Sequence, residues 1–292
     1  MAIRDILVCL DATDAGEHRL KIAAALANRH KAFLSAAYLD LQGSAGGGAV
    51  YGPGAVGIGI PLPLADDRAR EPAAAPEDQP APTHADILER RFRDALHLES
   101  YRGEWHLFDR GETDRLIALA KTTDLVVMGQ RQPDIAGGNE FPPQQVVMES
   151  GRPLLVVPYV GDFQSIGKRV LIGWDGTGEA ARAVHDALPL MADAAAVSVV
   201  TVAANLRGLE RAHESLQRIV HHLTRHGLPA RPEESPQGDI SIADLLLSRA
   251  ADLDADLLVI GAYHHSRVRE ALIGGVSQEL LQHMTVPVLM SH

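Results

Sequence analysis

Two aspartates stand at the ends of short apolar runs and could hold a nucleoside. Asp11 closes the run in VCLDAT, and Asp175 closes the run in IGWDGT. A carboxylate at the end of a buried strand can accept a hydrogen bond from an adenine amino group or a ribose hydroxyl. Asp and Thr are also strong helix N-caps, so the same residues could simply begin a helix. The pattern alone leaves both interpretations open.

A glycine-containing loop near the chain end could bind phosphate. Gly261 ends an apolar run, and Gly274 and Gly275 precede VSQELLQHM, a pattern that predicts a short amphipathic helix. Backbone N–H groups at a glycine-rich helix start bind phosphate, helped by the positive end of the helix dipole. The spacing by itself is a weak signal, and the missing Walker A lysine excludes a P-loop NTPase.

The elements that position these residues are written twice in the chain. RDILVCLDATDAGEHRLKIAAALA near the start corresponds to KRVLIGWDGTGEAARAVHDALPLMA in the second half. TTDLVVMG corresponds to DADLLVIG, and GRPLLVVP corresponds to TVPVLM. Three matched blocks in the same order indicate two copies of one unit. We expect the first domain to span residues 1–160 and the second to span residues 166–292.

Each copy alternates strand and helix patterns. Short continuous apolar runs such as ILVCL and PLLVVP are typical of strands buried on both faces of a parallel sheet. Helical spacing of apolar residues recurs over Glu112–Lys121 and over Asp239–Ala251. The sequence therefore predicts an α/β protein with two tandem, Rossmann-like, doubly wound parallel-sheet domains. Ligands of such sheets lie beyond the carboxyl ends of the strands, where the strand order reverses.

The first copy carries an insert over residues 42–85 that is rich in Gly, Ala and Pro. Its later part, residues 65–82, has the composition of a solvated linker. Its earlier part, Gly43–Leu64, carries many aliphatic side chains. We expect this earlier part to pack over the first copy's pocket or across the interface between the copies.

Composition excludes several classes of protein. The 292 residues are 46% hydrophobic and 22% charged, and the formal net charge is −11. Such an acidic chain lacks the basic face that nucleic-acid binding needs. The start of the sequence is not a signal peptide, and no apolar run approaches the ~20 residues of a membrane helix. Cys9 is the only cysteine, which excludes an intramolecular disulfide. We expect a cytoplasmic protein with no membrane partner.

On these motifs the chain resembles a tandem universal stress protein, with two copies of the adenine nucleotide alpha-hydrolase-like fold. The family's signature of Gly, two residues, Gly, nine residues, Gly and Ser or Thr falls on Gly261, His264, Gly274 and Gly275. His264 replaces the second glycine, so it either crowds the phosphates or donates to them. Gly275 replaces the hydroxyl residue, although Ser277 follows two positions later.

The resemblance implies ATP or another adenine nucleotide in the second copy, with Mg²⁺ only as a companion of the nucleotide. Asp175 matches the adenine-contacting aspartate of the family, and Val202 falls near the strand end where adenine lies. It also implies that Leu154–Val157 and Val288–Met290 meet across a pseudo-twofold axis as in a dimer, a surface that single-copy relatives use to form homodimers. The implied nucleotide-binding residues are Asp175, Gly176, Thr177, Val202, Gly261, His264, Gly274, Gly275, Val276 and Ser277.

The first copy departs further from this signature. Gln132 replaces the second glycine, and the phosphate loop becomes GGNEFPPQQ, with Glu140 about where the third glycine should stand. An acid repels phosphate, and the two prolines remove backbone N–H donors. We therefore expect the first site not to bind nucleotide.

The sequence supports other kinds of chemistry less well. His222 and His226 lie four residues apart and could ligate one metal ion, but a solvated helix face explains them better. Cys9 should be buried in a strand and unreactive, and Trp105 and Trp174 should anchor a core or an interface. The expected function is nucleotide-gated binding in a stress response, without catalysis. The alternatives are a stress scaffold with both pockets empty and an ATP-hydrolysing or ATP-transferring enzyme on the same fold.

Overall fold

The computed structural model describes residues 2–11, 13–40, 82–99, 102–109, 111–132, 142–203, 205–262 and 275–292. Most of the 42–85 insert, together with Glu140, His264 and Gly274, lies outside these ranges, so the predictions made for them stay predictions.

Ten strands form one sheet in the order β3-β2-β1-β4-β5-β10-β9-β6-β7-β8. The strands are β1 (Asp5–Leu10), β2 (Phe33–Asp40), β3 (Gly103–Asp109), β4 (Leu125–Gly129), β5 (Leu154–Val157), β6 (Arg169–Gly173), β7 (Ala196–Ala203), β8 (Ala230–Pro236), β9 (Leu257–Gly261) and β10 (Val288–Ser291). Each half of the sheet comes from one half of the chain, and all strand pairs within a half are parallel. The predicted doubly wound α/β fold is confirmed.

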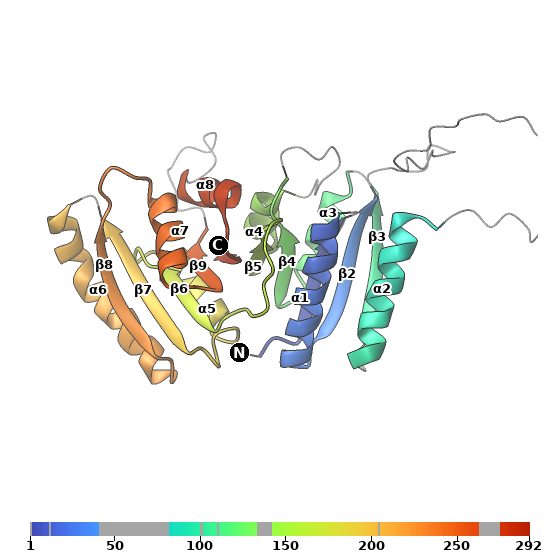
Figure 1. Ribbon diagram of the computed structural model, residues 1–292, viewed down its shortest axis with the longest axis horizontal. Helices are drawn as coiled ribbons and strands as arrows, with labels where there is room; N and C mark the ends of the chain where they lie inside the picture. Colours follow the sequence, from blue (N-terminus) through green and yellow to red (C-terminus); the bar gives the residue numbers. More distant parts are fainter. Residues whose placement is uncertain are drawn as a thin grey trace, which may run out of the picture.

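Helices cover both faces of the sheet (Figure 1). They are α1 (Asp14–His30), α2 (His84–Glu99), α3 (Thr113–Ala120), α4 (Pro143–Ser150), α5 (Gly178–Ala187), α6 (Leu206–Arg225), α7 (Ile242–Asp252) and α8 (Gly275–His283). Two buried apolar clusters result, one under α1, α2, α5 and α6, the other under α3, α4, α7 and α8. Inner strands such as β1, β4, β9 and β10 are buried on both faces because helices lie on both, which explains their continuous apolar sequence. The edge strands β3 and β8 are only partly buried.

The two halves meet along the antiparallel pair β5–β10, in which Leu155 lies opposite Leu289. This pairing confirms the prediction that the last strands of the two copies meet across a pseudo-twofold axis. A polar contact reinforces the junction: Arg29 of α1 donates to the carbonyls of Ile166 (2.8 Å) and Leu190 (2.7 Å). The two copies therefore share one sheet and lie side by side, as Figure 1 shows.

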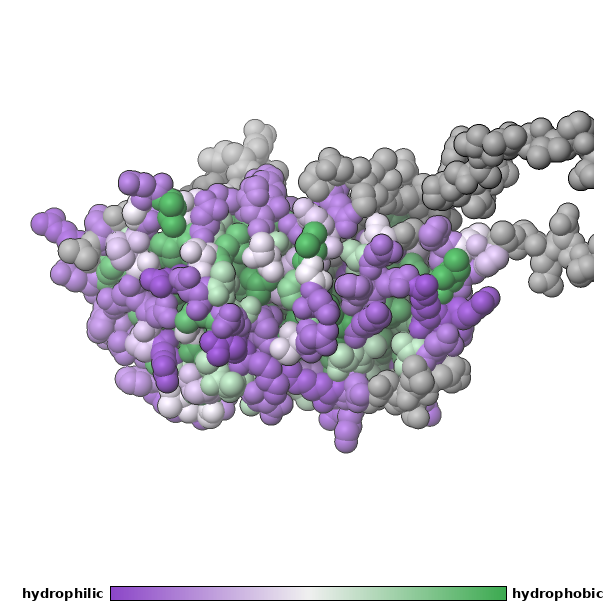
Figure 2. Space-filling view, in the orientation of Figure 1, coloured by the Kyte–Doolittle hydropathy of each residue, from purple (hydrophilic) through white to green (hydrophobic). Residues whose placement is uncertain are grey.

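The outer surface is mainly polar. On the face drawn in Figure 2, hydrophilic residues predominate and hydrophobic residues lie scattered between them. The exposed large hydrophobic side chains among the described residues are Leu107, Met148, Tyr159, Val160 and Ile240. Tyr159 and Val160 are neighbours in the segment after β5, and the other three lie in β3, in α4 and just before α7. No helix in the part of the chain that the structure describes is both long and apolar enough to span a bilayer.

Candidate functional site

A cavity of about 220 Å³ opens at the carboxyl ends of β6, β7 and β9 in the C-terminal half. Its lining residues are Gly173, Trp174, Asp175, Val200, Val202, Ile242, Leu246, Ile260, Gly261, Gly275, Val276 and Ser277. The strand order reverses here, because β6 lies between β7 and β9. This is the position at which doubly wound sheets bind ligands.

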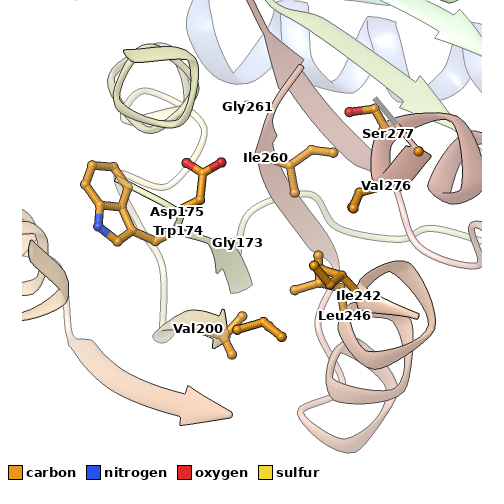
Figure 3. A pocket seen from close by; sticks show the side chains of 12 residues that line it. Gly173, Trp174, Asp175, Val200, Ile242, Leu246, Ile260, Gly261, Val276 and Ser277 are labelled. Carbon is orange, nitrogen blue, oxygen red and sulfur yellow. The ribbon is translucent and has the colours of Figure 1, made fainter. Parts of the chain in front are cut away.

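The cavity has one apolar wall and two polar ends. Figure 3 shows Ile242 and Leu246 of α7 facing Ile260 of β9, with Val276 of α8 beside them. The carboxylate of Asp175 lies on the other side of the space (Figure 3). A flat apolar group fits against the aliphatic wall, and polar groups of the same ligand can then reach the acid and the start of α8.

The acid at the mouth is fixed in place by the helix start that follows it. Asp175 accepts hydrogen bonds through Oδ1 from the backbone N–H (3.0 Å) and the hydroxyl (2.6 Å) of Thr177. The side chain is exposed, and no hydrogen bond from the described residues reaches its Oδ2. Asp175 therefore presents one oriented carboxylate oxygen to a ligand.

The helix cap is the threonine and not the aspartate. Thr177 caps α5 by accepting from the N–H of Ala180 at 3.2 Å, and Thr13 caps α1 by accepting from Gly16 at 3.2 Å. The acids are therefore not themselves the N-caps, although the pattern does begin a helix in each copy, and Oδ1 of each acid holds the capping threonine. This leaves the second carboxylate oxygen of each acid for another partner.

The start of α8 forms the other polar end. Gly275 and Val276 line the cavity from the first turn of α8, with Ser277, which is buried. A Cβ atom at Gly275 would meet nothing within 4 Å of the described residues, so the backbone there is open to the cavity. N–H groups at such a helix start suit a phosphate or another anion.

The structure gathers most of the predicted site residues around this cavity. Asp175, Val202, Gly261, Gly275, Val276 and Ser277 line it. Gly176 and Thr177 do not: Gly176 makes the turn at φ 78°, and Thr177 caps α5. The sequence interpretation missed the lining residues Gly173, Trp174, Val200, Ile242, Leu246 and Ile260. They lie in or directly after the strands β6, β7 and β9 and on the inner face of α7, positions that also describe ordinary core residues.

The matching acid of the first copy is already paired. The Oδ2 atom of Asp11 accepts from Nη2 of Arg19 at 2.8 Å, and both side chains are buried. Asp11 also holds Thr13 through Oδ1, as Asp175 holds Thr177. The residue eight positions after Asp175 is Ala183, which offers no such partner. The first copy therefore lacks the ligand-facing oxygen that the second copy keeps.

Bulkier side chains also fill the first copy where the second is open. The residue two before the acid is Cys9 in β1 but Gly173 in β6. In the outer strands Phe108 pairs with Leu39, whereas at the matching positions Ser235 pairs with Val202. Cys9, Leu39 and Phe108 are all buried in one cluster with Leu116 and Ala120 of α3. The cavity beside Asp11 has a volume of about 10 Å³, the size of one water molecule.

The helix that should hold phosphate in the first copy also differs. It begins at Pro143 and is preceded by Pro142, and neither residue has a backbone N–H. The predicted loss of donors at this helix start is confirmed. Glu140 lies outside the described residues, so its expected repulsion of phosphate stays a prediction.

The structure gives little support to the alternative metal-ligand and nucleophile candidates. The ring centroids of His222 in α6 and His226, the C-cap of α6, are 4.7 Å apart, and burial lowers the pKa of His222. Among the described residues there is no group of three His, Cys, Asp or Glu side chains that could hold a metal ion. Cys9 is buried in mid-strand as predicted, and burial raises its thiol pKa to about 12. A thiol of this kind is a poor nucleophile.

The two tryptophans hold different parts of the fold. Trp105 stacks on Tyr38 with ring centroids 5.8 Å apart, and it packs against the core. Trp174 borders the cavity, and its indole N–H donates to Oγ of Ser215 at 3.0 Å. The ring points away from Ile242 and Leu246 (Figure 3). Trp105 thus anchors the core from its edge, one of the two predicted roles, while Trp174 lies close enough to report on the cavity.

Comparison with known proteins agrees with this architecture. Residues 167–292 match the model of the universal stress protein family. A universal stress protein from Archaeoglobus fulgidus is 12% identical, with 98% of this chain and 97% of that chain covered and a TM-score of 0.64. A functionally unknown protein from Pseudomonas aeruginosa is 17% identical, with 99% and 92% covered and a TM-score of 0.62. No curated protein matches the sequence.

At these identities the solved structures establish the fold of the whole chain, and the family model establishes the family of its second half. The resemblance drawn from the motifs is thus confirmed at the level of family and fold. The C-terminal half of the chain is a universal stress protein domain, and the N-terminal half repeats its fold, as in a tandem universal stress protein.

Proposed function

We propose that this protein is a cytoplasmic stress-response protein that binds ATP or another adenine nucleotide in its C-terminal domain only, without catalysing a reaction. The observation that carries the proposal is the contrast between the two acids. Asp175 faces a cavity with a free carboxylate oxygen, whereas Asp11 is bonded to Arg19. A free oxygen beside an aliphatic wall suits the exocyclic amino group and the ring of adenine.

The remaining lining residues support a nucleotide over a bare nucleoside. Gly275 and Ser277 bring the start of α8 to the cavity, opposite the end that Asp175 occupies. The positive end of the helix dipole favours a phosphate group at that position. Any Mg²⁺ would arrive with the phosphates, held mainly by their oxygens.

The test begins with the nucleotide that co-purifies with the protein, released by denaturation and identified by chromatography. ATP and adenosine are then titrated into nucleotide-free protein, with the fluorescence of Trp174 as the signal. Trp105→Phe makes this signal specific, since Trp105 and Trp174 are the only tryptophans. Asp175→Asn should weaken both ligands about tenfold, the effect of a lost hydrogen bond to a charged group. Asn keeps an acceptor for Thr177 but removes the charge.

A matched control is Asp252→Asn, which removes an exposed acid at the far end of α7 and should leave both affinities unchanged. Equal losses in the two variants would contradict the proposed site. Failure of wild-type protein to bind any adenine nucleotide would favour a scaffold with empty pockets. Steady release of phosphate from ATP would favour an enzyme, and the proposed binding role would then be wrong.

A further inference from the structure

One buried side chain of the N-terminal domain reaches across to the helix that borders the candidate site. Gln130 follows β4 directly, and its side chain is buried. Its Nε2 donates to the carbonyl oxygens of Leu281 (3.2 Å) and Gln282 (3.0 Å) in the last turn of α8. Its Oε1 accepts from the backbone N–H of Tyr159 at 3.4 Å. The backbone N–H of Gln130 donates to the carbonyl oxygen of Val157 at 2.8 Å. The amide is therefore held at both ends.

The end of α8 needs such a donor. Carbonyls in the last turn of a helix have no intrahelical partner, and they cost free energy when they are buried without one. The equivalent helix α4 ends on Gly151, which adopts the left-handed conformation at φ 63°. No described residue after α8 has a positive φ, so α8 ends without a cap of that type. The amide of Gln130 supplies the missing donors from the other domain.

The matching residue of the second domain makes no such link. Ala262 matches Gln130 in the second domain, because each follows the terminal glycine of its strand and each donates its N–H to the last residue of the neighbouring strand. Ala262 has no side-chain donor. The N-terminal domain thus holds α8, and the matching position of the C-terminal domain offers no side-chain amide to α4.

We propose that Gln130 is a positioning residue, through which the N-terminal domain holds α8 and so fixes the place of Gly275 and Ser277 in the cavity. The effect on ligand binding rests on the nucleotide-binding function proposed above, while the effect on α8 does not. The C-terminal domain, whose cavity is open, therefore depends on the N-terminal domain, whose own pocket is filled.

The test replaces Gln130 by methionine, which has a similar length but no donor. In ligand-free protein, hydrogen–deuterium exchange over α8 should become about tenfold faster, while exchange over α4 stays unchanged. In nucleotide titrations ATP should bind about tenfold more weakly, because α8 contacts the phosphate end, and adenosine should change little. Gln164→Met is the control: this exposed glutamine bonds only Asp162 through its amide, and its loss should change neither readout.

Gln130→Asn is the second variant in case methionine prevents folding. It keeps the amide but shortens the side chain. Exchange over α8 and ATP affinity should therefore change in the same directions but by less. Unchanged exchange over α8 in a folded variant would overturn the proposal, as would equal losses for ATP and adenosine. Faster exchange over α8 in a protein that binds no nucleotide would leave the positioning role standing and refute the proposed function instead.

Discussion

Arg19 and Asp11 form a buried ion pair in the N-terminal domain, with Nη2 and Oδ2 2.8 Å apart. Arg19 also lies against β4, since a Cβ atom on Gly129 would come within 2.1 Å of its Nη1. Among the described residues, its buried Nε and Nη1 atoms have no hydrogen-bond partner. Arg19 therefore satisfies Oδ2 of Asp11 within the protein. In the second copy, the corresponding oxygen of Asp175 is left for a ligand.

The first prediction concerns the stability of this pair. Replacing either Arg19 or Asp11 by alanine should lower the free energy of unfolding by about 3–5 kcal/mol, because the other charge stays buried without a partner. Replacing both should cost less than the sum of the two single changes. Urea denaturation of the four proteins measures the coupling.

Strictly additive losses would show that Asp11 and Arg19 do not act as a pair. The second domain offers a control, since Asp175 is exposed and the residue eight positions later is Ala183, where the first domain has Arg19. Asp175→Ala should therefore change the unfolding free energy far less than Asp11→Ala does.

The second prediction is the stoichiometry of nucleotide binding. Calorimetric titration with ATP should saturate at no more than one nucleotide per chain, because Arg19, Cys9 and Phe108 fill the pocket region of the first copy. The Arg19→Ala variant, if folded, should still bind one, since Cys9 and Phe108 stay in place. A stoichiometry of two in wild-type protein would show that the first site is active.

Much of the fold could be predicted because it depends on patterns that repeat. The resemblance to the tandem family implied the pairing of Leu154–Val157 with Val288–Met290. Alternating buried strands and amphipathic helices predicted the doubly wound sheet, and the matching blocks predicted two copies of one unit. These features depend on hydrophobic periodicity, which one sequence displays directly. The helix starts were less well predicted, because Asp and Thr two positions apart can both serve as caps.

The ion pair of the first copy was missed although the sequence carries a sign of it. Arg19 lies on the apolar stripe of α1, three residues after Gly16 and four before Ala23, both of which are buried. A charge at such a position needs a buried partner. Which acid pairs with it depends on how α1 folds back over β1, and that tertiary contact cannot be read from spacing. Gln130 was missed for the same reason, because its partners lie in the other domain.

The third prediction concerns Cys9, whose thiol pKa burial raises from 9.0 to about 12. The native state therefore keeps its thiol proton at pH values where the unfolded chain has lost its own. The stabilising effect of burying a neutral thiol should be full below pH 9 and should be lost as the pH rises through about 12. The unfolding free energy of wild-type protein should thus fall relative to that of Cys9→Ala above pH 9.

The same thiol should be inert in the folded protein. Ellman's reagent at pH 8 should label Cys9 only as fast as the N-terminal domain opens, and labelling should become complete in denaturant. Rapid labelling of native protein, or parallel pH curves for wild type and Cys9→Ala, would show that Cys9 is not shielded.

The last prediction is that a residue taken from the first domain will partly close the cavity of the second domain. Gly173 lines the cavity, and a Cβ atom there would lie 3.2 Å from Cγ2 of Ile260 and 3.5 Å from Cδ1 of Leu246. Gly173→Cys introduces the residue found at the matching position 9 and should fill part of the aliphatic wall. Because the proposed function puts the base against this wall, ATP and adenosine should both bind about tenfold more weakly, in contrast to the Gln130 variants. Gly178→Cys is the control, since a Cβ at that helix position meets nothing within 4 Å and lies outside the lining residues. Unchanged adenosine affinity in a folded Gly173→Cys protein would show that the base does not bind against this wall.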